Sequence, residues 1–189
     1  MGLLATQIPD DVFETIAKNA GILLNEFDPE TWTVSRSAIK GATTGGIDFK
    51  DAPSYTDYGE DIDNCPKGTM ELQEIESREV TAASTYVSVR PAEIKNLVVA
   101  ADKVGDKITP RNELKTSDFE KEIWFVTDYG VDGAIAIRLD NVMNTDGFAL
   151  KTTDKGKGNF AFNYKAHYSI KDPDKVPYEI FIKEGTKTE

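Results

Sequence analysis

The sequence has very few of the residues on which most enzymes and secreted domains depend. Its 189 residues include a single cysteine, Cys65, and a single histidine, His167. One cysteine excludes an internal disulfide, so the architecture of a small disulfide-stapled domain does not apply. A Cys65–His167 pair would still need an orienting group and an oxyanion site, which no flanking segment supplies. We therefore expect no enzymatic activity and no cofactor.

Long apolar runs are also missing. The start, from Met1 to Ala5, has no basic segment before its short apolar patch, which is not the pattern of a signal peptide. No stretch approaches the length that a membrane span requires. These absences predict a protein that is made in a reducing cytoplasm and has no membrane partner.

Basic residues are scarce relative to acidic ones. The chain has 22 Lys and Arg against 33 Asp and Glu, and its formal net charge is -11. Tight binding to DNA requires clustered Lys and Arg that neutralise phosphates, so this composition disfavours it. An acidic surface would instead repel DNA.

Two segments match ligand-binding motifs only superficially. The glycine-rich segment 41–46 is followed by Ile47 and Asp48, where a phosphate-binding loop needs Lys and then Ser or Thr. We interpret it as a flexible turn between strands. Acidic residues crowd the same region, but their spacing matches no EF-hand, so we interpret them as a solvated loop and predict no metal site. They are Asp48, Asp51, Asp57, Glu60, Asp61 and Asp63.

Two helices are predicted. Segment 9–21 starts with acidic residues, has apolar residues at helical spacing and stops at Gly21. The apolar segment 22–27 follows it, and these side chains must pack on the chain's own body or on a neighbour. Residues 1–27 are therefore interpreted as an N-terminal arm. Pro91 opens a second helix, 91–102, whose apolar face predicts that it flanks a sheet.

Alternating apolar and polar residues predict strands over most of the remaining chain. Region 40–68 is the exception, because its Gly, Pro and Asp content predicts a long loop with brief extended pieces. The clearest strand is 160–170, where large apolar residues occupy every second position. Further extended segments are predicted at 31–38, 47–49, 54–58, 69–90, 122–129, 134–142, 148–152 and 177–183.

These elements predict one mainly β domain over residues 1–189. An early helix, many strands and one later helix are typical of a β-sandwich or a partly open barrel, built of two packed antiparallel sheets with flanking helices. Trp32 and Trp124 lie in strand-like runs, so we interpret them as core residues rather than as a sugar-binding platform.

Several phrases of the sequence, taken together, resemble the major tail protein family of long-tailed bacteriophages and prophages of Firmicutes. They are distributed over nearly the whole chain, and each is weak by itself because none encodes a reaction. The phrases are Ile8 to Phe13, Gly21 to Leu24, Gly41 to Ile47, Asp57 to Pro66, Ile108 to Asn112, Asp118 with Phe119, Ile123 to Val126, and Val176 to Ile180.

The resemblance implies a tail-tube-like fold and a structural role in the virion tail. In that family, subunits form hexameric rings whose sheets join into an inner barrel, and stacked rings form the tube through which the genome passes. The implied partners are further copies of the chain and the tape-measure, tail terminator and baseplate proteins, with DNA crossing the lumen unbound. Joining sheets across subunits would also remove exposed strand edges.

Two sets of residues are predicted to serve this assembly. The first set is expected at subunit contacts and comprises Phe13, Ile22, Leu23, Leu24, Phe27, Gly41, Gly45, Gly46 and Ile47. The second is expected on polar strand faces that line the lumen and comprises Glu71, Glu74, Glu76, Asn163, Lys165 and His167.

A different class of protein also fits the strands and aromatic residues. A β-sandwich adhesion domain, of a phage tail or a cell surface, would bind a glycan or protein ligand as a monomer. It leaves the combination of phrases unexplained. The oligomeric state of the purified protein distinguishes the two hypotheses.

Overall fold

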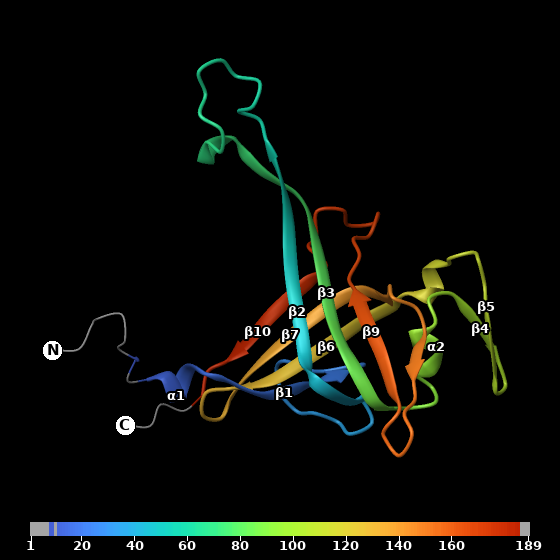
Figure 1. Ribbon diagram of the computed structural model, residues 1–189. Coiled ribbons are helices and arrows are strands. Elements are labelled where there is room, and N and C mark those ends of the chain that lie inside the picture. The colour runs from blue at the N-terminus through green and yellow to red at the C-terminus, as the bar shows by residue number, and fades with distance from the viewer. Residues whose placement is uncertain (1–7, 10, 186–189) are drawn as a thin grey trace.

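A computed structural model describes residues 8–9 and 11–185, and the fold is mainly β (Figure 1). The helices are single turns. In chain order the elements are α1 (Val12–Thr15), β1 (Ala17–Leu24), β2 (Gly41–Asp57), the 3-10 helix η2 (Met70–Leu72), β3 (Gln73–Val89), α2 (Ile94–Leu97), β4 (Ala101–Val104), β5 (Lys107–Pro110), the 3-10 helix η3 (Thr116–Asp118), β6 (Glu120–Tyr129), β7 (Gly133–Asn144), β8 (Ala149–Lys151), β9 (Asn159–Lys165) and β10 (Tyr178–Lys183).

Eight strands of the described chain form one antiparallel sheet that curls into a nearly closed barrel. The strand order is β1-β6-β7-β9-β3-β2, with β10 paired to β7 and β8 paired to β9. The N–H of Lys40 donates to the carbonyl of Leu23 at 2.9 Å, which brings the start of β2 beside β1. The predicted mainly β class is confirmed. Of the two predicted architectures, a β-sandwich and a partly open barrel, the observed sheet resembles the barrel. A second, small sheet consists of β4 and β5 (Figure 1).

The barrel interior holds the main hydrophobic core. Tyr86 of β3 stacks on Phe162 of β9 with 4.3 Å between ring centroids, and both side chains are buried. Leu23, Ile123 and Leu139 reach the same cluster from β1, β6 and β7. The alternation predicted for β9 is confirmed here, although the strand ends at Lys165 rather than continuing to residue 170.

A second cluster lies on the other face of β1, β6 and β7. Successive strand residues point to opposite faces, so Leu24 and Trp124 turn away from the barrel interior that holds Leu23 and Ile123. The connection from β1 to β2 covers them, with Phe27 packing against Trp32 and Trp124 at centroid distances of 5.7 and 5.4 Å. Trp124 is thus the core residue expected. Segment 31–38, predicted to be extended, is instead turns and isolated bridges.

The predicted N-terminal helix is wrong beyond one turn. After α1 the chain becomes β1 at Ala17, and it pairs with β6 through an irregularity between Lys18 and Ile22. Asn19 and Gly21 adopt left-handed φ values of 63° and 69° there. Pairing with β6 gives this segment backbone hydrogen bonds and buries its apolar side chains. These gains outweigh the weak helical preference that the spacing of its apolar residues indicated.

The predicted long loop over 40–68 is also wrong for most of its length. β2 runs 17 residues and pairs with the 17 residues of β3 as a long hairpin. Gly45 and Gly46, both at φ 82°, sit in a bulge where the register shifts between Thr44 and Asp48. Pro53 is tolerated because β2 is an edge strand, and an edge does not require its missing N–H.

The middle helix is shorter than predicted. α2 covers only Ile94–Leu97, and β4 begins at Ala101 inside the range 91–102 that the sequence assigned to helix. Leu97 nevertheless packs into the core, as a flanking helix should. None of the helices in the described part of the chain has the length and apolar composition of a membrane span.

Candidate functional site

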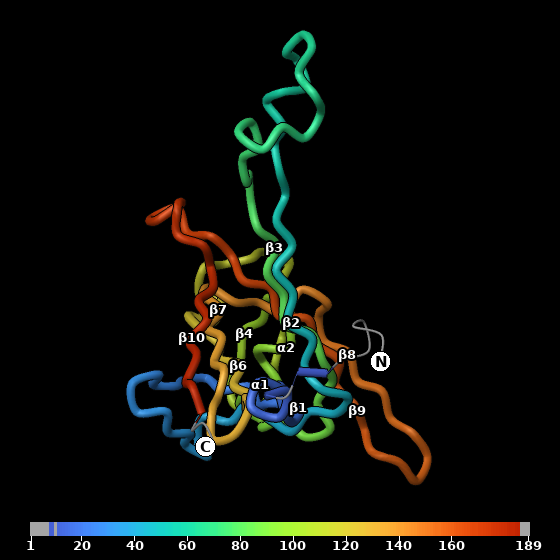
Figure 2. The backbone as a smooth tube through the Cα atoms, turned by 90° about the vertical axis from the view of Figure 1, so that its left-hand side faces the viewer, coloured from blue at the N-terminus to red at the C-terminus, as the bar shows by residue number. Residues whose placement is uncertain are grey.

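The distal half of the β2–β3 hairpin projects away from the barrel. Figures 1 and 2, two views related by a quarter turn about the vertical axis, both show it rising clear of every other element. We call residues 54–77 the distal hairpin. Near its base, the Tyr168 hydroxyl accepts a hydrogen bond from the Arg78 N–H at 3.1 Å, and Arg78 pairs with Asp51.

Hydrogen bonds organise the loop at the end of the distal hairpin. The Asp57 carboxylate accepts from the N–H groups of Gly68 and Gly59, each at 2.9 Å, and these bonds lower its pKa below the usual value. Glu60 pairs with Lys67 at 2.7 Å across the loop. The Asp57 hydrogen bonds and the Glu60–Lys67 pair connect the two sides of the loop. The loop backbone therefore has a defined conformation, and its outward side chains have defined positions.

The distal hairpin is both apolar and acidic at its surface. It contains seven Asp and Glu residues but only one basic residue, Lys67. Large apolar side chains stand in solvent on a two-stranded ribbon that has no core of its own, which is typical of a surface that binds a partner. The exposed fractions are 79% for Met70, 60% for Tyr55, 59% for Tyr58, 50% for Ile62 and 44% for Ile75.

Some residues of the N-terminal arm that are predicted at subunit contacts are exposed, and others are buried. Phe13 on α1 is 66% exposed, and Lys18 lies over its ring at 3.7 Å. Leu23 and Leu24 are fully buried inside their own chain, and Ile22 and Phe27 pack against the second cluster. The apolar segment therefore packs on its own body, and Leu23 and Leu24 have no exposed surface with which to contact another subunit.

The predicted contact residues of the glycine-rich segment lie at the base of β2. Ile47 packs against the core, and Gly41 fits closely beside Tyr86, where a Cβ atom would lie 2.9 Å from the ring. Gly45 and Gly46 face open space, with no atom within 4 Å of a Cβ built on either. The bulge at Gly45 and Gly46 is thus open to a neighbour, whereas Gly41 and Ile47 pack within the chain.

The two groups of predicted lumen residues lie on different parts of the molecule. Glu71, Glu74 and Glu76 belong to the distal hairpin. Asn163 and Lys165 lie on the outward face of β9, in register with Ala83 and Thr81 of β3. His167, just beyond β9, bonds through Nδ1 with the Asn141 carbonyl at 3.1 Å and packs edge-on against Phe119.

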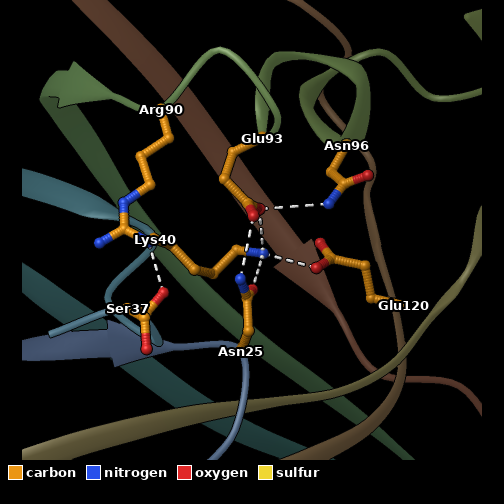
Figure 3. Close-up of polar contacts among 7 residues, drawn as sticks. All are labelled: Asn25, Ser37, Lys40, Arg90, Glu93, Asn96 and Glu120. Carbon is orange, nitrogen blue, oxygen red and sulfur yellow. Dashed lines mark hydrogen bonds and ion pairs between the residues drawn. The ribbon is translucent and has the colours of Figure 1, made fainter. Parts of the chain in front are cut away.

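A buried lysine holds the seam where the barrel closes (Figure 3). Lys40, just before β2, is fully buried, and its Nζ lies 2.7 Å from Glu93 Oε2 and 2.5 Å from Glu120 Oε2. Its third donor goes to Asn25 Oδ1 at 2.8 Å. Asn25 also donates a hydrogen bond to Glu93. Lys40, just before β2, is therefore bound to Asn25 after β1, to Glu93 before α2 and to Glu120 at the start of β6.

The two carboxylates around Lys40 have opposite pKa shifts. Burial raises the pKa of Glu93, but the charge of Lys40 and hydrogen bonds from Lys40, Asn25 and Asn96 outweigh it, so the net pKa is lowered. For Glu120 burial outweighs the attraction of Lys40, and the pKa is raised. Glu120 Oε1 is buried without a hydrogen-bonding partner among the described residues. Nothing in the local sequence marks Lys40, because its partners lie 53 and 80 residues away.

A polar cleft of about 370 Å³ lies beside His167. Lys121, Arg138, Asp140 and Lys175 contribute to its walls, and Arg138 and Lys175 are both paired with Asp140, at 3.1 and 2.8 Å. An adjoining hollow of about 320 Å³ is lined by Phe119, Tyr168 and Ile170. Glu122 and Asp172 also line the cleft, so acidic and basic side chains alternate around it.

Cys65 and His167 lie on separate elements. The Cys65 Sγ contacts the Thr69 hydroxyl at 3.4 Å in the loop of the distal hairpin, whereas His167 bonds to the barrel. Over residues 8–9 and 11–185, no group of three or more His, Cys, Asp or Glu side chains gathers in a way that could hold a metal ion. Neither the models of known protein families nor the curated proteins contain a match to this chain.

Proposed function

We propose that this chain is a structural subunit of a phage-type tail tube, which assembles with copies of itself into stacked hexameric rings and catalyses no reaction. The observation that carries the proposal is the distal hairpin, an ordered ribbon with exposed Tyr55, Met70 and Ile75 that stands clear of its own barrel. Such a surface is costly to leave in water and is stabilised when a neighbour covers it.

The free edges of the sheet support the same proposal. β10 pairs only with β7, and β2 beyond its start pairs only with β3, so each leaves one edge open among the described strands. Open edges favour pairing with a further chain. In a ring, they are the places where the sheet of one subunit continues into the next.

The outward face of β2, β3 and β9 is the surface we assign to the lumen, with Asn163 and Lys165 on it. Its side chains near β9 are small or polar, and Lys165 pairs with Glu79 at 3.0 Å. Asp48 and Lys50 of β2 lie on the same outward face, and their opposite charges balance each other. A wall of this kind offers DNA no cluster of cations to bind, which suits passage of a genome without attachment.

Size-exclusion chromatography with light scattering over a concentration series, followed by negative-stain microscopy, tests the proposal. Wild-type protein is expected to form rings or tubes at high concentration. A matched variant in which residues 55–75 are replaced by Asn-Gly should keep the circular dichroism spectrum of a β protein but remain a monomer. A wild-type protein that stays monomeric at every concentration would overturn the proposal.

The cleft beside His167 favours a second function, that of a monomeric ligand-binding domain of a phage tail or cell surface. Its volume of about 370 Å³ fits a small polar ligand such as a sugar, and the neighbouring Phe119 and Tyr168 offer aromatic faces. A glycan array with the monomer tests it. Binding that disappears in the Tyr168→Ala variant, without self-assembly, would favour this function over the tube.

A further inference from the structure

One end of the molecule is acidic and apolar, and the opposite end is basic and apolar. The connection between β8 and β9 projects from the barrel at the end opposite the distal hairpin in both views (Figures 1 and 2). We call residues 148–158 the lysine loop. It carries Lys151, Lys155 and Lys157 against one acid, Asp154, and residues 148–157 are exposed throughout.

We infer that the end of the distal hairpin of one copy docks on the lysine loop of a second copy. This inference rests on the proposed function and names the surface that receives the hairpin. The charges are complementary, because Asp61 and Asp63 are exposed at the hairpin end and Lys155 and Lys157 are exposed on the loop.

Apolar side chains accompany the charges on both sides. Ile62 stands between the two aspartates, with Met70 at the other side of the loop. On the receiving side, Phe148 is 46% and Leu150 51% exposed. Contact between these patches removes apolar surface from water, whereas the surrounding opposite charges set the orientation and exclude a hairpin-to-hairpin pair of like charge.

The position of the two surfaces determines the kind of assembly. A contact between different patches at opposite ends is heterologous, and it repeats from copy to copy instead of closing into a dimer. The copy at one end of the stack then has a free lysine loop, and the copy at the other end has a free hairpin. The docking therefore builds the long axis of an assembly rather than the circumference of a ring.

Paired charge reversals test the inference with the full-length chain. Variant one carries Asp61→Lys and Asp63→Lys, and variant two carries Lys155→Glu and Lys157→Glu, all at exposed positions. Each variant alone brings like charges together and should weaken association at least tenfold in sedimentation velocity. Equal mixing of the two variants restores opposite charges at every contact and should restore association.

Carbodiimide cross-linking of the wild-type protein provides a second measurement. A mixture of isotopically light and heavy chains should yield light–heavy peptide pairs that join the segment around Asp61 to the segment around Lys155. If the wild type assembles but each variant assembles equally well, or if mixing restores nothing, the docking is overturned while the tube proposal stands. If the wild type never assembles, both are overturned.

Discussion

Lys40 Nζ lies 2.5 Å from Glu120 Oε2 and 2.7 Å from Glu93 Oε2 in a seam where the lysine has no exposed surface. A buried cation between two carboxylates is costly to form but more costly to disrupt, because removing one partner leaves an uncompensated charge. The seam joins the segment before β2 to the residue that precedes α2 and to the start of β6, at the place where the barrel closes.

Lys40→Met should destabilise the protein by about 3–5 kcal/mol, because Glu93 and Glu120 would then face each other without a cation. The free energy of unfolding from urea titration measures the change. The control is Lys165→Met, which breaks the exposed pair with Glu79 and should cost less than about 1 kcal/mol. Equal losses in the two variants would contradict a special role for the buried pair.

The two carboxylates of the seam should give opposite pH dependences. The pKa of Glu93 is lowered in the folded state, so its contribution is present above the unfolded value of 4.5 and is lost as pH falls through the folded pKa. The pKa of Glu120 is raised, so its ionisation costs stability as pH rises from 4.5 through the folded pKa.

Glu93→Gln should therefore lose about 3 kcal/mol at neutral pH and progressively less as pH falls below 4.5, whereas the loss in Glu120→Gln should shrink as pH rises above 4.5. Urea titrations at a series of pH values from acid, below the folded pKa of Glu93, to neutral measure both trends. The exposed Glu79→Gln serves as control, with an expected loss below about 1 kcal/mol throughout. Parallel trends in the two seam variants would argue against the assigned shifts.

Truncation at the N-terminus should separate the arm from the barrel. Deleting residues 1–27 removes β1 together with Leu23 and Leu24, both fully buried, and the product should lose its cooperative thermal transition. Deleting residues 1–9 leaves α1 and β1 intact and should preserve the transition. Circular dichroism during heating checks both, and a cooperative fold without β1 would show that its core contribution is dispensable.

The stacked pair of Tyr86 and Phe162 should dominate the stability of the barrel core. Phe162→Ala is expected to cost about 3–5 kcal/mol and to lower Tm by about 10 °C, because the cavity lies between β3 and β9. Calorimetry measures the shift in dilute, monomeric protein. Phe148→Ala, at a side chain 46% exposed, is the matched control and should shift Tm little.

The strands with strong local signals were predictable, and those formed by distant pairing were not. β6 and β7 follow from apolar runs on either side of a turn at Gly130 to Gly133 and appear close to their predicted positions. Residues 17–21, the first part of β1, are predicted as helix because their spacing suits a helix. Their extended form comes from pairing with β6, about a hundred residues later, which a local pattern does not contain.

The sequence by itself determined the mainly β class, the acidic charge and the alternating strands, because these depend on composition and on side-chain periods of two. Only the tertiary structure decided that segment 41–57 is a strand of a projecting hairpin, that Leu23 and Leu24 are core, and that Lys40 is buried between two carboxylates. The physical reason is that burial and backbone pairing depend on partners supplied by distant segments. The hairpin end and the lysine loop likewise lie at opposite ends of the molecule because the barrel stands between them.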